Sequence, residues 1–317
     1  MKIAEFLPAI PNQLWDLSAQ IGVSHVICKC APDLTGLKAP DDFESLRVIH
    51  ERFAERGFKL AGLEGDQFDM NRIKFGLPGR EADVERYRNM LTNMGRLGIP
   101  LLCYNFMAGI GWHRNDTAFP LRGGALGSSF DRRTTPDTLT EFGTLDKEAL
   151  WENYAWFIEQ VMPAAEAAGV KMGLHPDDPP VESLRGIARI MSSTEGFRRA
   201  LSYSNSPSHG LTYCQANFTL LGDADRTLLR EFRERVHFVH FRDVRGTAEC
   251  FHETFHDDGP TDMAAMIRLY REIGFEGPIR VDHVPTMAGE ANDHPGYGAL
   301  GRLFAVGYLK GILDATT

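Results

Sequence analysis

Short apolar or β-branched segments alternate with longer amphipathic segments along most of this chain. The short segments are closed by Gly, Pro or a charged residue, which is typical of buried parallel strands. The longer segments repeat apolar residues at a spacing of three and four, as Leu46, Ile49 and Phe53 do within residues 42–56. This alternation predicts βαβ units and a parallel sheet.

The pattern predicts eight strands and eight helices. Strands are expected at Lys2–Phe6, Ser24–Cys28, Lys59–Glu64, Pro100–Phe106, Val170–Leu174, Gly210–Tyr213, Val236–Val239 and Pro278–Val281. Helices are expected at about 12–20, 42–56, 81–97, 148–168, 184–201, 224–234, 262–273 and 299–313. The count predicts one (β/α)₈ TIM barrel over residues 1–317, a length that is normal for this fold with loop insertions.

Residues 107–145 interrupt the alternation with a segment rich in Gly and Arg. A connection this long inside a compact domain is usually a functional loop or lid. It follows the fourth strand, so we expect a long lid loop over the barrel mouth. The alternative is a disordered insertion. The aromatic side chains of Trp112, Phe119 and Phe130 argue against disorder, because they are available to pack.

Each of the last four predicted strands ends at a residue that can bind a divalent metal: His175, Cys214, His240 and Asp282. A parallel barrel brings these strand ends together around one axis. Singly, such a His is more often structural and such a Cys more often a small apolar group. Their equivalent positions predict an open, catalytic metal site, with Asp177 or Asp178 and Arg242 as neighbours that orient the ligands. Two imidazoles, one thiolate and one carboxylate suit Mn²⁺, Fe²⁺, Co²⁺ or Zn²⁺ better than Mg²⁺ or Ca²⁺.

Further titratable residues lie close to this set in sequence. His283 directly follows the last ligand candidate, and Tyr297 lies in a Gly-rich segment. Either can donate or accept a proton, although Tyr297 could instead pack on the final helix. His252 and His256 are four apart within residues 251–259. A helix is doubtful there, so we expect a substrate-contacting or a solvated loop rather than a second metal site.

Composition narrows the class of protein. The chain is 43% hydrophobic and 24% charged, close to a soluble globular average, with a net charge of −9 and no basic stripe. Nucleic-acid binding is therefore disfavoured. No apolar run approaches the roughly 20 residues of a membrane span or the core of a signal peptide. The five cysteines are odd in number and scattered, which predicts a reducing, cytoplasmic setting.

Several motifs carry a family resemblance. They are His175–Pro180, Thr212–Cys214, His237–Arg242, Asp282–His283, Cys103–Met107, Trp112–Arg114, Phe251–Glu253 and Gly307–Leu309. In this order, over nearly the whole chain, they resemble the motifs of the D-mannonate dehydratases. The resemblance implies a xylose-isomerase-like barrel with Mn²⁺ held by His175, Cys214, His240 and Asp282. It also implies that D-mannonate loses water to give 2-dehydro-3-deoxy-D-gluconate in hexuronate breakdown, with Tyr297 as a catalytic residue.

The chain departs from the family in its lid. The chain is shorter than typical members. It reads Trp112-His113-Arg114 where they usually read Trp-Thr-Arg, and it lacks their Pro-Asp-Gly-Ser-Lys sequence at residues 122–127. These differences bear on the identity of the sugar acid more than on the type of reaction.

The expected reaction assigns roles to individual residues. Tyr297 and His283 share the tasks of taking the C2 proton and protonating the departing C3 hydroxyl. Arg242 and Arg114 are expected to fix the carboxylate or hydroxyls of the substrate. Asn105 and Trp112 are the other substrate-binding candidates.

Two other classes of function remain open at this point. One is a metal-dependent sugar isomerase or epimerase on the same barrel. The other is a non-catalytic protein that binds a sugar acid. A homo-oligomer is compatible with the sequence under each of these readings.

Overall fold

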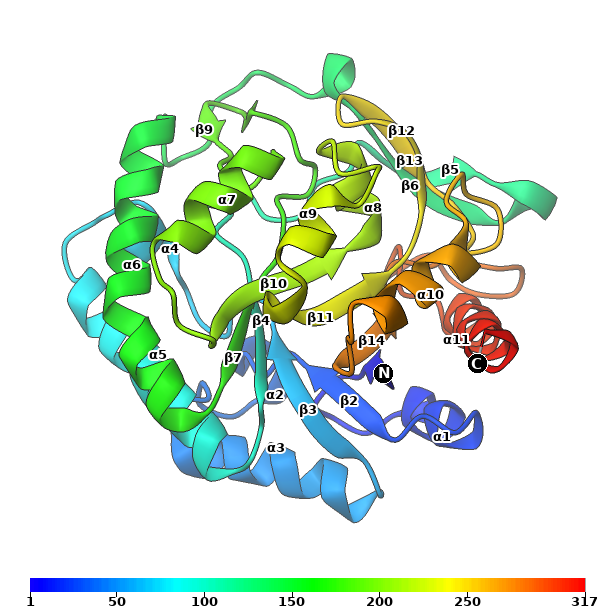
Figure 1. Ribbon diagram of the computed structural model, residues 1–317, viewed down its shortest axis with the longest axis horizontal. Coiled ribbons are helices and arrows are strands. Elements are labelled where there is room, and N and C mark those ends of the chain that lie inside the picture. The colour runs from blue at the N-terminus through cyan, green and yellow to red at the C-terminus, as the bar shows by residue number, and fades with distance from the viewer. Residues whose placement is uncertain (317) are drawn as a thin grey trace.

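A closed barrel of eight parallel strands forms the centre of the computed structural model, which describes residues 1–316 (Figure 1). Around the barrel the order is β1 (Lys2–Phe6), β14 (Pro278–Val281), β11 (Val236–Phe241), β10 (His209–Cys214), β7 (Lys171–Leu174), β4 (Leu101–Tyr104), β3 (Lys59–Glu64) and β2 (His25–Cys28). β1 pairs with both β2 and β14, which closes the ring. The predicted TIM barrel is confirmed.

Helices surround the barrel on its outside (Figure 1). They are α1 (Gln13–Gln20), α2 (Pro32–Thr35), α3 (Phe43–Glu55), α4 (Asn71–Lys74), α5 (Arg80–Arg96), α6 (Lys147–Ala168), α7 (Thr194–Ser202), α8 (Gln215–Leu220), α9 (Thr227–Glu231), α10 (Met263–Glu272) and α11 (Ala299–Ala315), with short 3₁₀ turns η1 (Arg122–Gly124), η2 (Arg132–Thr134) and η3 (Arg233–Arg235). Side-chain caps fix where several begin: Asp42 accepts from the Ser45 amide before α3, and Asp262 from the Ala265 amide before α10.

The barrel interior is packed with side chains. A cluster inside it is formed by Ala4, Ile27, Ala61, Leu101, Cys103 and Phe238. A larger apolar core lies between the strands and the surrounding helices. Because the interior is filled, a ligand is confined to an end of the barrel, and in this fold that end is where the strands finish.

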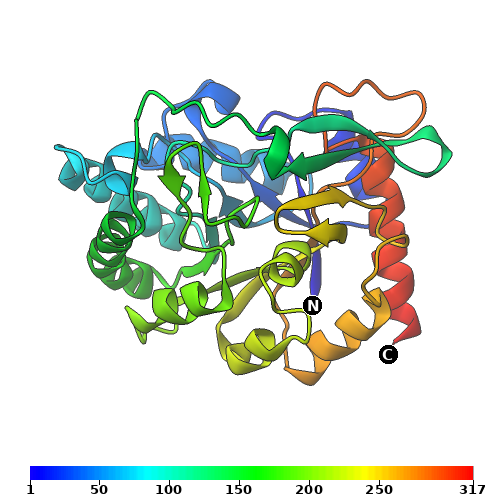
Figure 2. The same ribbon diagram turned by 90° about the horizontal axis from the view of Figure 1, so that it is seen from above.

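Residues 107–145 contain strands instead of one long loop. β5 (Asp116–Pro120) and β6 (Leu126–Asp131) join β13 (Cys250–Glu253) and β12 (Val244–Thr247) in an antiparallel sheet of order β12-β13-β6-β5, which we call the mouth sheet. Its four labels lie together in Figure 1, and Figure 2 shows its two hairpins side by side. The expected long lid loop is not confirmed, because β6 pairs with β5 and with β13 and makes part of this segment a sheet.

The helix expected at 184–201 is also shorter than predicted. α7 begins at Thr194 behind the Ser193 cap, and residues before it form the small hairpin β8 (Ser183–Leu184) and β9 (Ile187–Ala188). Between these strands Arg185 and Gly186 have φ values of 51° and 82°. A right-handed helix requires negative φ at every residue, so the helical pattern is interrupted there.

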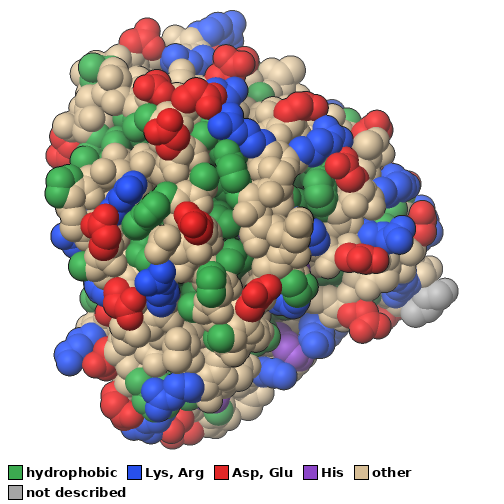
Figure 3. All heavy atoms as spheres, turned by 60° about the vertical axis from the view of Figure 1, so that its left-hand side comes forward, with side chains coloured by type: hydrophobic (Ala, Val, Ile, Leu, Met, Phe, Trp, Pro, Cys, Tyr) green, Lys and Arg blue, Asp and Glu red, His purple; other side chains and the backbone are tan. Residues whose placement is uncertain are grey.

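The outer surface carries interspersed charges. On the face in Figure 3, basic and acidic side chains alternate without gathering into a stripe of one sign. Among residues 1–316, no helix is both long enough and apolar enough to cross a bilayer.

Candidate active site

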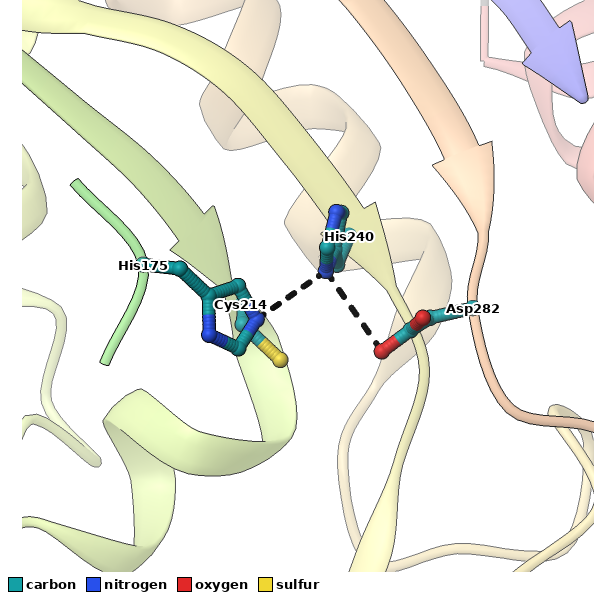
Figure 4. A group of neighbouring side chains, drawn as sticks. All are labelled: His175, Cys214, His240 and Asp282. Carbon is teal, nitrogen blue, oxygen red and sulfur yellow. Dashed lines mark hydrogen bonds and ion pairs between the residues drawn. The ribbon is translucent and has the colours of Figure 1, made fainter. Parts of the chain in front are cut away.

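Four side chains of metal-binding type meet at the carboxyl ends of neighbouring strands (Figure 4). One ligand-type atom each from His175, Cys214, His240 and Asp282 lies within 4.8 Å of the other three. His240 Nδ1 lies 3.2 Å from His175 Nε2 and 3.4 Å from Asp282 Oδ2. Ligand atoms about 2.0–2.3 Å from a shared tetrahedral ion are roughly 3.3–3.8 Å apart. The spacing therefore suits a cation between these atoms.

The ligand-type atoms are held by their neighbours. His175 Nδ1 donates to the Pro176 carbonyl oxygen at 2.7 Å, which leaves the Nε2 lone pair directed into the cluster. Asp282 Oδ2 accepts from Arg242 Nε at 2.7 Å, and its Oδ1 lies 2.8 Å from Arg280 Nη2. On the other side of His240, Nε2 lies 3.5 Å from Glu64 Oε2 and has no hydrogen-bond partner.

Charges in the cluster favour a bound cation. Burial raises the pKa of Cys214, but the Arg242 charge and the neighbouring His175 and His240 rings outweigh burial and bring it to about 5. The thiol is therefore a thiolate at neutral pH. Five anionic groups then face three guanidinium groups: Cys214, Glu64, Asp178, Glu253 and Asp282 against Arg114, Arg242 and Arg280. Burial and the Arg280 charge lower the pKa of His240, but the Asp282 and Glu64 charges outweigh them and raise it above its usual value. The excess of anions therefore attracts positive charge, which a proton on His240 supplies or, with both imidazoles neutral, one divalent cation would supply.

A cavity of about 270 Å³ opens on this cluster. Its walls are Glu64, Gly65, Cys103, Tyr104, Asn105, Met107, Trp112, His175, Asp178, His240, Asp282, His283 and Tyr297. Cys214 has no exposed surface. A small molecule in this cavity would therefore contact both imidazoles and the carboxylate together with Asn105, Trp112, His283 and Tyr297.

The Asn105 side chain presents its amide nitrogen as the free group. Its Oδ1 accepts from Lys74 Nζ at 3.2 Å and from the Met107 amide at 3.1 Å. With the oxygen engaged by two donors, Nδ2 is left to donate to a ligand in the cavity.

The His283 ring lies between two other rings. Its centroid is 5.3 Å from that of Trp112 and 5.4 Å from that of Tyr297, both edge-on. Gly296 has φ +85°, and a Cβ there would approach the His283 ring to 3.2 Å, so glycine allows this close packing. Burial, aided by the Asp282 charge and opposed by Arg280, raises the pKa of Tyr297 to about 12.

The two arginines expected to bind substrate lie outside the cavity lining. The side chain of Arg114 is 0% exposed and donates to Asp178 and Glu253, both at 2.5 Å. That of Arg242 is 1% exposed and bridges Asp282, Asp178 and Asn217. Because carboxylates already occupy both guanidinium groups, this geometry does not support a direct contact with substrate. They hold the carboxylates around the cluster in place.

The histidines after β11 do not line the cavity either. His252 stacks on Phe119 in the mouth sheet, with ring centroids 4.5 Å apart. His256 packs against Phe241, and burial lowers its pKa to about 4. The geometry gives neither ring a contact with substrate, and His256 is not solvated.

Sequence reasoning assigned no role to three residues of this site, although Cys103 and Glu253 lie within the motifs that carry the family resemblance. Glu64 ends β3 and Cys103 lies near the end of β4, so extending the rule about strand ends to earlier strands would have found both. Glu253 is not at the end of a barrel strand, because it reaches His283 from the mouth sheet.

Known proteins resemble this chain in sequence and in fold. The family described as D-mannonate dehydratase (UxuA) matches residues 22–141 and 134–317. A mannonate dehydratase of Streptococcus equi subsp. zooepidemicus is 34% identical over 77% of this chain and 75% of its own. A mannonate dehydratase of Enterococcus faecalis is 31% identical over 90% of this chain and 92% of its own.

Solved structures agree with these sequence relatives. The crystal structure of mannonate dehydratase from Streptococcus suis serotype 2 superposes with a TM-score of 0.89 and 29% identity, covering 100% of this chain and 93% of the other. The crystal structure of a xylose isomerase domain protein from Planctomyces limnophilus has a TM-score of 0.65 at 14% identity, covering 99% of this chain and 98% of the other. This likeness concerns the fold alone. With the family match extending over residues 22–317 and relatives of this similarity, the chain belongs to the D-mannonate dehydratase family.

Proposed function

We propose that this protein is a metal-dependent dehydratase that removes water from D-mannonate to give 2-dehydro-3-deoxy-D-gluconate, a step in hexuronate breakdown. The observation that carries the proposal is the meeting of four ligand-type atoms within 4.8 Å, beside a cavity that also contains His283 and Tyr297. The sequence relatives described as mannonate dehydratases supply the choice of substrate.

His175, Cys214, His240 and Asp282 would hold the metal in this proposal. Mn²⁺ is the first candidate, and Fe²⁺, Co²⁺ and Zn²⁺ suit the same nitrogen, sulfur and oxygen donors. When bound, such an ion supplies Lewis-acid stabilisation of the negative charge that develops next to the substrate carboxylate. Support for a cation comes from the excess of anionic over guanidinium groups in the cluster and from the Cys214 thiolate.

The remaining chemistry belongs to the side chains of the cavity. His283 Nε2 takes the proton from C2, and the electrons of that C–H bond form the C2=C3 double bond. The C3–O bond breaks, and the departing hydroxyl leaves as water with a proton from the Tyr297 hydroxyl. The enol product then becomes the 2-keto acid by taking a solvent proton at C3 and releasing the proton of its C2 hydroxyl to solvent. The proton gained by His283 leaves to solvent and Tyr297 regains one from it, which restores both side chains.

Asn105 and Trp112 position the substrate in this proposal. The free Nδ2 of Asn105 donates to a substrate oxygen. Trp112 covers the apolar C–H face of the sugar acid, since this residue is 39% exposed and lines the cavity. A reducing, cytoplasmic setting is part of the same proposal, because the chain's five cysteines are all unpaired.

Incubation with D-mannonate tests the function. The protein is stripped with a chelator, reloaded with Mn²⁺, Fe²⁺, Co²⁺ or Zn²⁺, and assayed for a 2-keto-3-deoxy acid. Formation of that acid, dependent on the ion, supports the proposal. A product of unchanged mass would make the protein an isomerase or epimerase, and the absence of turnover with every ion and with a panel of aldonic acids would indicate a binding protein.

A further inference from the structure

A carboxylate outside the barrel strands contacts the proposed base. Glu253 ends β13 of the mouth sheet, where it lies opposite Val244 of β12. Its Oε1 accepts a hydrogen bond from His283 Nδ1 at 2.8 Å. The two side chains are each only 7% exposed, so water competes little for this bond.

The hydrogen bond determines which nitrogen of His283 faces the substrate. An ionised carboxylate only accepts hydrogen bonds, so the Nδ1 that contacts it must carry the proton. In the neutral ring the other nitrogen, Nε2, is then a bare acceptor. Nε2 lies 3.9 Å from Asp282 Oδ1 and therefore points toward the metal-binding cluster.

Glu253 is itself fixed in an ionised state. Its Oε1 also accepts from Arg114 Nη2 at 2.5 Å and from Arg242 Nη1 at 3.5 Å. The strand register adds a second constraint, since Phe251 and His252 of β13 pair with Phe130 and Ser129 of β6. The position of this carboxylate therefore depends on both arginines and on the mouth sheet.

We propose that Glu253 is the positioning residue of the reaction: it holds His283 in the Nδ1–H tautomer, keeps Nε2 directed at the substrate C2 proton, and stabilises the imidazolium formed when that proton arrives. The proposal rests on the function above and deepens it. It gives the mouth sheet a role in catalysis, since folding of this sheet delivers the carboxylate. It also gives Arg114 and Arg242 a purpose other than substrate binding.

The first test measures the tautomer and needs no turnover. His283 is observed by ¹⁵N NMR in protein with labelled histidine, loaded with diamagnetic Zn²⁺, and its signals are assigned by their loss in His283→Gln. A protonated Nδ1 and a bare Nε2 support the proposal. A protonated Nε2 overturns it, whatever the outcome of the D-mannonate assay.

The second test separates positioning from general stability. Correct general-base catalysis contributes roughly 10²–10⁴-fold, so Glu253→Gln, which keeps the shape and loses the charge, should lower kcat at least about 10-fold with KM and bound metal unchanged. In a His283→Gln background the same change should have no further effect, because Glu253 acts through that ring. An equal loss of kcat in both backgrounds would refute the assignment.

Asp243→Asn provides the matched control. Asp243 is a buried carboxylate just before β12, and it accepts from Thr261 and from the Val244 amide without touching His283. Its replacement should leave kcat close to the wild-type value. If Asp243→Asn lowers kcat as much as Glu253→Gln does, the effect belongs to loop stability and the proposal fails.

Discussion

Replacing Cys214 by Ser tests the metal centre most directly. The sulfur lies in a side chain with no exposed surface, at the end of β10, beside His240 in the strand register. Its pKa of about 5 makes it a thiolate at neutral pH. A serine hydroxyl stays neutral there, so the variant loses one of the five negative charges of the cluster and its only soft ligand.

The expected size of the effect follows from the number of ligands. Structural zinc sites with four protein ligands bind with about 10–16 kcal/mol. Shared over four ligands this is roughly 3 kcal/mol each, which corresponds to about a 10²-fold weaker affinity. The fold should survive, because the substitution removes no carbon atoms and the barrel interior remains packed.

Competition with a chromophoric chelator measures the affinity, and elemental analysis after dialysis measures the metal retained. Cys103→Ser is the matched control, because Cys103 lines the same cavity but burial raises the pKa of its thiol. We expect Cys103→Ser to bind metal as the wild type does. Undiminished affinity in Cys214→Ser, or an equal loss in both variants, would refute the four-ligand centre.

Three further predictions test the cavity and the fold. Tyr297→Phe should lower kcat by roughly 10²-fold or more while metal content stays constant, since it removes only the proposed acid; unchanged kcat would exclude that role. Trp112→Ala should raise KM several-fold with a smaller effect on kcat, as steady-state kinetics would show. Burial, reinforced by the Arg235 charge, lowers the pKa of His209 in the folded protein to about 3. In the unfolded chain the histidine pKa is about 6.5. Below that pH the unfolded chain binds a proton that the folded protein does not, so the free energy of unfolding falls as the pH falls. Urea unfolding at pH 7 and pH 5 should therefore show that the free energy of unfolding falls by up to about 1.4 kcal/mol per pH unit. His209→Gln should reduce this dependence on pH, and an unchanged dependence in the variant would contradict the prediction.

The sequence located the metal-binding candidates because strand ends are a local feature. An apolar run closed by His175 or Asp282 can be recognised within a few residues. Parallel strands of one barrel must finish at the same end, so the meeting of these side chains follows once the barrel is assumed. The expected elements agree with the structure wherever one strand or helix is specified by its own residues, as in β3 and β14.

Tertiary structure decided everything that depends on long-range pairing. The strand β6, which contains Phe130, pairs locally with β5, but only its pairing with β13, far along the chain, joins the two hairpins into one sheet. The same pairing brings Glu253 to His283, thirty residues away in sequence. No local pattern contains that information, because a strand edge can pair with any compatible edge that the fold brings to it.

The sequence by itself determined the barrel, the ends of its strands and the residue types that gather there. Only the folded chain decided which charged side chains face the cavity. Arg114 and Arg242 resemble substrate-binding residues in sequence, yet buried carboxylates occupy both. The physical reason is that burying a guanidinium group is costly unless it is paired. Its orientation is therefore set by where the anions lie in three dimensions, and sequence spacing does not specify that.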